Sequence, residues 1–271
     1  MDRRDLITGQ FNRDSLDLSD PIQSSYAYAK LVGSAGNEMV HYSLEGTIFA
    51  LLPDGVQPFI RFQALLKGVW KRKDQGDYQF RLYEVGFFHN LDSSEPIEVF
   101  DNPITNETNV LSGIKGGPYN RVIRPKNLDW VISGDDIWIQ EPVPMSGYFG
   151  SEPSNNQIKQ NAFSNAIYRG KLSELSDQSL IAPSMMTYNY ISPWYPFFGI
   201  DDVDTKIYWQ AVGNKIQSRS DLPQPMKEYL SEKQRNYFKS SNPWTKKTST
   251  LSHYRDFQKK GIVNEKEKSH E

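Results

Sequence analysis

Two consecutive runs of alternating apolar and polar residues constrain the fold of this chain more than any other feature. In residues 57–71 the even positions are mostly apolar and the odd positions mostly polar. A period of two is typical of a β-strand with one buried face, here with a bulge near Leu65 or Gly68. Residues 74–77 form a turn, after which the run YQFRLYEVGFFH at 78–89 alternates again. The pattern predicts an antiparallel β-hairpin.

Short apolar segments continue at close spacing along the rest of the chain. They predict further strands at 97–100, 109–112, 130–133, 137–140, 163–169, 184–190 and 206–216. Such spacing is typical of an antiparallel meander. We therefore predict a mainly β fold, either a single antiparallel β-barrel or a strongly curved β-sheet of the calycin-like type, with a few peripheral helices.

The two ends of the chain differ in composition from its middle. We predict a flexible N-terminal arm at 1–20, a single β-rich domain at 21–245, and a charged, partly disordered C-terminal tail at 246–271. One short helix is expected after a cap at Ser24 or Ser25, ending at Gly33.

A second helix is expected near the end of this domain. Pro223 and Pro225 introduce it, and Met226, Tyr229, Leu230 and Tyr237 follow at helical spacing. Proline at the first helical position is tolerated because the backbone N–H there has no partner within the helix.

The composition excludes several kinds of site. The chain has no cysteine, so disulfides, thiolate metal sites and a cysteine nucleophile are excluded. No metal-ligating histidine cluster and no glycine-rich phosphate loop is present, and we predict neither a metal nor a cofactor. A net charge of −2 gives no basic footprint for nucleic acid.

The N-terminus contains Arg3-Arg4, the pair with which a twin-arginine export signal begins. The residues that follow are polar and acidic, where such a signal needs an apolar stretch. No apolar run approaches the roughly 20 residues that cross a bilayer. We therefore predict a cytoplasmic protein that does not associate with a membrane.

The segment 188–200, YNYISPWYPFFGI, carries six aromatic residues and two prolines. The prolines stiffen the backbone and remove two hydrogen-bond donors. So many rings on a stiff connection have to be buried against the core, a ligand or a partner, and a homodimer stays open. If a ligand is bound, the substrate-binding candidates are Tyr188, Tyr190, Trp194 and Tyr195.

Four other residues are catalytic candidates. His41 and Glu45 share one face of a predicted strand, and they form an acid–base pair if that face lines a barrel lumen. If the face points to water, they are ordinary surface residues. Tyr119 and Arg121 lie in the Gly- and Pro-rich run GIKGGPYNR, which we expect to be irregular and able to bind an oxygen of a small molecule. Otherwise this run and the aromatic segment simply plug the barrel ends.

These observations leave three functional hypotheses. The first is a small-molecule enzyme without a tightly bound cofactor, an isomerase, cyclase or lyase acting on an apolar oxygenated metabolite, as in secondary metabolite biosynthesis. The second is a non-catalytic carrier of a small-molecule ligand. The third is a protein-interaction module that uses the aromatic segment.

Three short motifs carry a family resemblance. They are Phe100-Asp101-Asn102-Pro103 with Glu107, the Trp-Tyr-Pro of the aromatic segment, and Leu222-Pro223 with Tyr229-Leu230. The chain resembles, over about residues 25–245, the bacterial and fungal family known as domain of unknown function 1838. In the turn NPITNE, Asn106 occupies the position of the family's glycine. The family's following histidine has no counterpart in 114–119, which weakens any catalytic role that the resemblance alone would give to that run.

Overall fold

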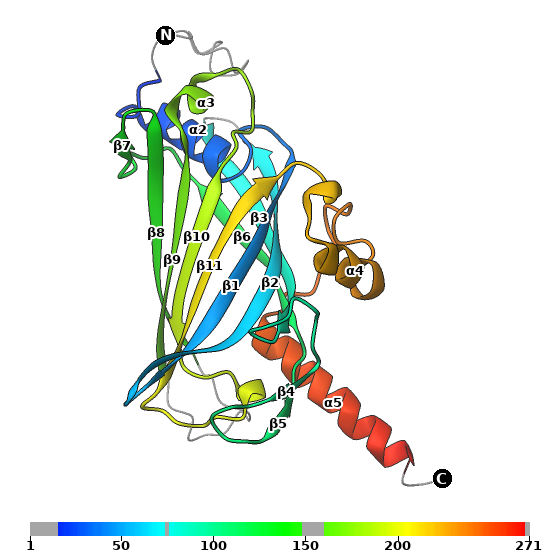
Figure 1. Ribbon diagram of the computed structural model, residues 1–271. Helices are drawn as coiled ribbons and strands as arrows, with labels where there is room; N and C mark the ends of the chain where they lie inside the picture. The colour runs from blue at the N-terminus through cyan, green and yellow to red at the C-terminus, as the bar shows by residue number, and fades with distance from the viewer. Residues whose placement is uncertain (1–15, 74–75, 148–159, 269–271) are drawn as a thin grey trace.

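The computed structural model describes residues 16–73, 76–147 and 160–268. They form a nine-stranded antiparallel sheet that curls strongly about its long axis (Figure 1). The strand order is β6-β3-β2-β1-β11-β10-β9-β8-β7. The strands are β1 (Met39–Leu52), β2 (Gly55–Arg72), β3 (Tyr78–His89), β6 (Ile114–Ile123), β7 (Val131–Ser133), β8 (Asp136–Gly147), β9 (Gln160–Lys171), β10 (Met185–Ser192) and β11 (Lys206–Ile216). The predicted mainly β, strongly curved sheet is confirmed.

The strand register explains which side chains face the interior. Leu66 of β2 lies opposite Tyr42 on one side and Glu84 on the other, so these residues share the concave face. Because side chains alternate along a strand, the odd-numbered residues of β1, of β3 and of β2 from Arg61 onward point to the convex face, whereas a bulge in β2 turns Phe59 to the interior. Strands β2 and β3 pair antiparallel, as the predicted hairpin requires.

Helix α2 (Pro21–Val32) fills the upper end of the curled sheet (Figure 1). Residues 23–32 are all buried, so this helix belongs to the core rather than to the periphery. Its N-cap is Asp20, whose carboxylate accepts from the backbone N–H groups of Ile22 and Gln23, and not Ser24 or Ser25. Its C-cap is Gly33, as predicted.

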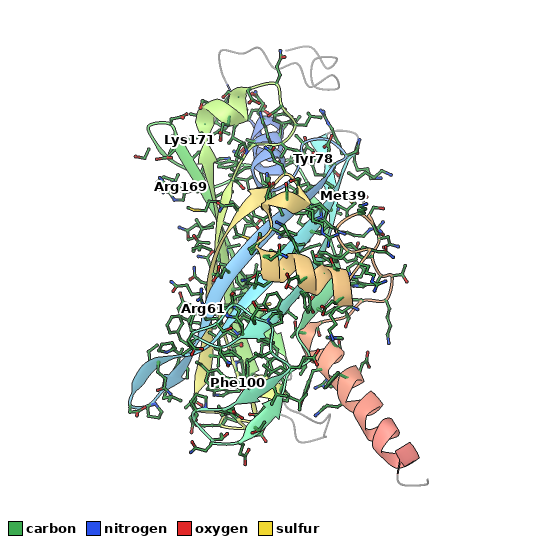
Figure 2. All side chains as sticks on the ribbon, turned by 45° about the vertical axis from the view of Figure 1, so that its right-hand side comes forward. Met39, Arg61, Tyr78, Phe100, Arg169 and Lys171 are labelled. Carbon is green, nitrogen blue, oxygen red and sulfur yellow. The ribbon has the colours of Figure 1, made fainter. Side chains whose placement is uncertain are left out.

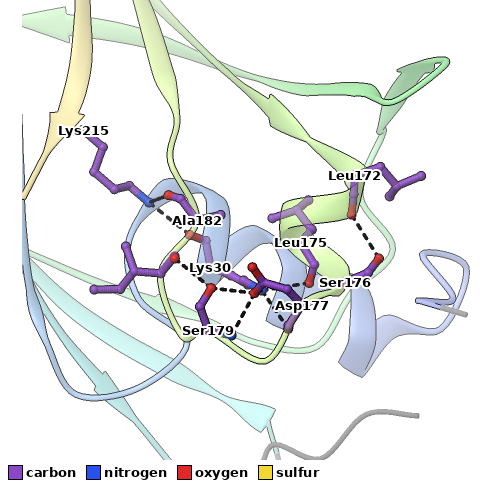
Figure 3. A network of polar contacts seen from close by, with 9 residues as sticks. Lys30, Leu172, Leu175, Ser176, Asp177, Ser179, Ala182 and Lys215 are labelled. Carbon is purple, nitrogen blue, oxygen red and sulfur yellow. Dashed lines mark hydrogen bonds and ion pairs between the residues drawn. The ribbon is translucent and has the colours of Figure 1, made fainter. Parts of the chain in front are cut away.

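The buried Lys30 and the half-buried Lys215 hold α2 in place (Figure 3). The Lys30 ammonium is fully buried and donates to the carboxylate of Asp177 at 2.6 Å. Lys215, at the end of β11, donates to the carbonyls of Lys30, Leu31 and Gly33 at 2.6–3.1 Å, and to that of Ala182 at 2.9 Å. Burial lowers the pKa of Lys215 to about 7, whereas these carbonyls favour the ammonium form.

The aromatic segment closes the lower end. The 3-10 helix η2 (Pro196–Phe198) lies beside the small hairpin of β4 (Val99–Asp101) and β5 (Thr108–Val110). Its Phe198 packs edge-on against Phe59 at 5.1 Å between ring centroids, and Phe100 packs against Phe59 at 5.0 Å. Figure 2 shows Phe100 at this end of the sheet.

A second layer covers the convex face over β2 and β3. Helix α4 (Gln224–Lys233) and the residues after it form a second apolar cluster with Leu65, Tyr83 and Val85. Tyr237 closes the cluster, since its hydroxyl donates to the backbone carbonyls of Leu65 and Tyr83. The helix predicted after Pro223 is confirmed, although it ends before Tyr237.

The structure differs from the expectations in three elements. The run containing Tyr119 and Arg121 is not an irregular loop but part of strand β6, which pairs with β3. Helices α3 (Leu172–Ser176) and α5 (Thr250–Lys268) were not expected. Most of the predicted arm at 1–20 lies outside the described residues. Among the described residues, no helix is long and apolar enough to cross a membrane.

Replacing Lys215 by methionine is expected to destabilise the fold by about 2–4 kcal/mol, because four buried carbonyls lose their donor. Lys206→Met is the matched control, since Lys206 also lies on β11 but donates to one carbonyl at an exposed site. We expect it to change stability by no more than about 0.5 kcal/mol. Urea denaturation measures both, and equal effects would contradict the role assigned to Lys215.

Candidate functional site

The concave face of the sheet encloses a cavity of about 280 Å³. Two different walls surround it. Strands β9, β10 and β11 and the aromatic segment contribute rings, whereas β1, β2, β3 and β6 contribute mostly aliphatic side chains. The rings are those of Tyr168, Tyr188, Tyr190, Tyr195 and Trp209, and the aliphatic side chains include Leu44, Ala64, Leu66, Leu82 and Ile114. Such a cavity suits a small, flat, largely apolar molecule.

Glu84 places a carboxyl group in this apolar surface. It lies on β3 opposite Gly116 of β6, and both residues are on the cavity side. A Cβ at position 116 would come within 2.0 Å of the Glu84 carboxyl oxygen and 2.6 Å of the Tyr119 hydroxyl. Only glycine leaves that room. Tyr119 donates its hydroxyl to Glu84 at 3.4 Å and thereby orients the carboxyl group.

Burial raises the pKa of Glu84 from its ordinary value of 4.5 to about 7, and the hydrogen bond from Tyr119 opposes this shift only in part. Among the described residues, no ion pair joins Glu84 to a cation. A carboxyl group with a pKa near neutrality can both accept and return a proton at physiological pH.

Three tyrosines face Glu84 across the cavity. Burial, and then the charge of Glu84, raises the pKa of Tyr188 well above its ordinary value, so its hydroxyl stays protonated. The hydroxyls of Tyr190 and Tyr195 lie 3.5 Å apart. The Tyr188 hydroxyl has no hydrogen-bond partner among the described residues, and it is available to a bound molecule.

An ion pair closes the side of the cavity between the strands β6 and β8. Arg121 of β6 binds Glu141 of β8 at 3.2 Å, and the Tyr28 hydroxyl of α2 donates to the same carboxylate. The Arg121 guanidinium also lies over the ring of Phe80, 5.4 Å from its centroid. These contacts join two strands that no backbone hydrogen bonds connect within the described part of the sheet.

The structure brings most of the residues singled out from the sequence to this cavity. Tyr188, Tyr190, Tyr195 and Arg121 line it, and Tyr119 contacts it through Glu84. Trp194 does not. Its indole N–H donates to the Thr205 hydroxyl at 2.8 Å. Its ring packs against Phe59, with the ring centroids 5.2 Å apart, among the side chains that close the lower end of the sheet. The aromatic segment therefore both lines the cavity and seals the end below it.

His41 and Glu45 lie on the convex face, which corrects the hypothesis that their strand face lines the lumen. His41 is buried under Phe238, with the ring centroids 4.1 Å apart, and burial together with the charge of Lys67 lowers its pKa to about 4. Glu45 is exposed and pairs with Arg61, a residue visible on the outer surface in Figure 2. The structure does not bring either side chain to the cavity.

Sequence reasoning missed Glu84 and Glu141, although both left a signal. Along 78–89 the even positions are otherwise Tyr, Phe, Leu, Gly and Phe, so Glu84 is a single carboxyl on an apolar face. Glu141 likewise continues the apolar positions Ile137 and Ile139 of β8. A buried charge needs a partner or a function. No group of three metal-ligating side chains is found in the described parts of the chain.

The comparison with protein families matches residues 37–260 to "Protein of unknown function (DUF1838)". This match spans most of the chain. The chain belongs to the DUF1838 family. The match begins after α2, and it includes all nine strands of the sheet. No curated protein matches the chain.

The turn NPITNE at residues 102–107, one of the motifs that suggested this family, supports the aromatic segment where it closes the lower end of the sheet. Asn102 is buried, its side-chain amide donates to the carbonyl of Phe198 at 2.6 Å, and its side-chain oxygen accepts from the backbone N–H of Ile104. Asn106 has a φ of 57°, in the left-handed region that glycine favours and that asparagine tolerates. The motif therefore holds the aromatic segment in place.

Glu84→Gln is expected to stabilise the fold at high pH and to change little at low pH. Because the pKa is raised, the cost of an ionised carboxylate is absent below the ordinary value of 4.5 and complete above about 7. We expect a gain of about 1–2 kcal/mol near pH 8, less than the full shift implies because the side chain borders the cavity. Urea denaturation across this pH range measures it. The exposed Glu95→Gln is the control, and a gain independent of pH would contradict the assignment.

Substitutions of Trp194 and Tyr188 are expected to distinguish the two roles of the aromatic segment, which are to seal the lower end of the sheet and to line the cavity. Trp194→Ala removes a fully packed ring and should cost about 3–5 kcal/mol of stability. Tyr188→Phe removes a hydroxyl without a partner among the described residues and should change stability by no more than about 1 kcal/mol. Thermal or urea unfolding measures both. A large destabilisation by Tyr188→Phe would show that its hydroxyl supports the fold.

Proposed function

We propose that this DUF1838 protein is an enzyme that moves a proton on a small, apolar, oxygen-bearing molecule, with Glu84 as the general base. The reaction is of the isomerase, cyclase or lyase type and uses no tightly bound cofactor. The observation that carries the proposal is the position of Glu84, a carboxyl group that Tyr119 holds against a ring-lined cavity and that no cation pairs with among the described residues. As the sequence predicts, we place this activity in the cytoplasm.

The cavity provides one group that removes the proton and another that stabilises the enolate formed. The Glu84 carboxylate takes a proton from a carbon next to a carbonyl, and the electron pair moves onto the carbonyl oxygen to form an enolate. The Tyr188 hydroxyl, which faces Glu84, donates a hydrogen bond to that oxygen as its negative charge develops. Where the substrate carries a double bond between its β and γ carbons, the enolate is conjugated with it, and Glu84 then returns the proton to the γ carbon while the double bond moves to the α and β carbons, so that atoms and charge balance in an isomerisation.

The other residues of the site act as positioning groups. Tyr119 orients the Glu84 carboxyl group, and Gly116 leaves the space that the carboxyl occupies. Tyr190, Tyr195 and Trp209 form a ring wall that holds the substrate flat against the aliphatic strands. The fully buried Phe197 and Phe198 keep the lower end dry, which strengthens electrostatic interactions within the cavity.

Two alternatives remain as outcomes of experiment. A carrier would use the same cavity for binding, with protonated Glu84 as a hydrogen-bond donor and no turnover. An interaction module based on the aromatic segment has less support, because Trp194, Phe197 and Phe198 are buried within this chain and present no ring to a partner.

Proton exchange in deuterated water tests the proposal even while the natural substrate is unidentified. A panel of small enolisable aryl ketones is incubated with the protein, and deuterium uptake next to the carbonyl is followed by NMR. We expect uptake with at least one ketone, a loss of at least about 100-fold in Glu84→Gln, and no loss in the control Glu95→Gln. The rate for wild type should rise with pH and level off above about 7, as Glu84 ionises.

Gly116→Ala provides a second arm, because the added methyl displaces the Glu84 carboxyl group without changing its chemistry. We expect a loss of exchange rate with little loss of ketone binding. Ketones that bind saturably and exchange at the same rate with wild type and Glu84→Gln would overturn the enzyme in favour of the carrier.

A further inference from the structure

A groove of about 400 Å³ lies outside the cavity, between strands β6 and β8. It shares Arg121, Glu141 and Val143 with the cavity lining. The two hollows therefore adjoin each other at the ion pair of Arg121 and Glu141. A ligand that displaces this ion pair, or passes beside it, places one part in the cavity and another in the groove.

The groove is basic, unlike the cavity. Its charged residues are Arg121, Arg124, Lys126 and Glu141. Glu141 neutralises Arg121 at 3.2 Å, whereas neither Arg124 nor Lys126 has an ion-pair partner among the described residues. Two positive charges thus face the groove without a counter-charge, in a protein whose net charge is −2.

These two cations stand on an ordered backbone. The buried Ser25 of α2 donates its hydroxyl to the carbonyl of Arg124 and accepts from the backbone N–H of Lys126, both at 3.2 Å. These two hydrogen bonds fix the chain after β6 to helix α2, which fills the upper end of the curled sheet. A cation on a fixed backbone loses less conformational entropy when it binds an anion than one on a mobile loop.

We propose that the ligand of this site carries an anionic group, a carboxylate or a phosphate, that lies in the groove against Arg124 and Lys126 while its apolar body occupies the cavity. The proposal rests on the proposed function only in placing a ligand in the cavity. Ion pairs at exposed sites are weak, so we expect the two cations together to strengthen binding by about tenfold. Salt weakens this contribution and leaves the apolar part unchanged.

Three matched probes test the proposal: 3-(2-naphthyl)propanoate, 3-(2-naphthyl)propyl phosphate and the neutral 3-(2-naphthyl)propanol. Their affinities are measured by naphthalene fluorescence at low and at high salt. We expect both anions, or one of them, to bind more tightly than the alcohol at low salt. The preference between carboxylate and phosphate identifies the anionic group.

The double variant Arg124→Gln/Lys126→Gln should weaken anion binding by about tenfold and leave the alcohol unchanged. The control Lys239→Gln/Lys246→Gln removes the same charge from exposed residues outside the groove and should leave all three affinities unchanged. Equal binding of anions and alcohol to wild type would overturn the groove proposal alone. Failure of all three probes to bind would overturn the proposed small-molecule site as well.

Discussion

The curled sheet has an apolar concave face that its own hydrogen bonds do not close. Strand β6 forms one edge, and β8 is paired beyond β9 only with the three residues of β7. Side chains must therefore complete the enclosure. Helix α2 fills one end, the aromatic segment with its Asn102 turn fills the other, and the pair of Arg121 and Glu141 spans the gap between edges. Every other property of the site depends on these three closures, because they remove the concave face from water.

A cavity closed in this way changes the chemistry of the groups inside it. A carboxyl group at the surface keeps its ordinary pKa, whereas Glu84 faces rings and aliphatic side chains and is held half-ionised near neutrality. The same exclusion of water keeps the tyrosine hydroxyls protonated as donors. The two lysines of the upper end have a different role: the buried Lys30 and the half-buried Lys215 bind backbone carbonyls and a carboxylate, and thereby position a helix. Burial alone therefore does not distinguish the carboxyl group that we propose as a base from these structural lysines. Their hydrogen-bond and ion-pair partners distinguish them.

Much of the fold and part of the site followed from local patterns. The alternation in β2 and β3, the bounds of β11 and the helix ending at Gly33 were all predictable, since each depends on side-chain periodicity or a cap within one segment. Strand β6 was not, because its glycines and Pro118 are typical of loops, and only the need for space beside Glu84 and Leu82 explains them. Tyr119, Arg121, Tyr188, Tyr190 and Tyr195 were selected by residue type. His41 and Glu45 were selected by the same reasoning, which could not tell the inner from the outer face of β1.

The sequence by itself determined that the chain forms long antiparallel strands with one apolar face, and that a stiff aromatic segment must be buried. Both follow from interactions within a few residues: the two-residue repeat of a strand and the restricted backbone of proline. Only the tertiary structure decided which face is concave, which rings border the cavity and which seal it, and that Glu84 meets Tyr119. These depend on register and curvature, which bring together residues more than thirty positions apart, such as the two partners of that hydrogen bond.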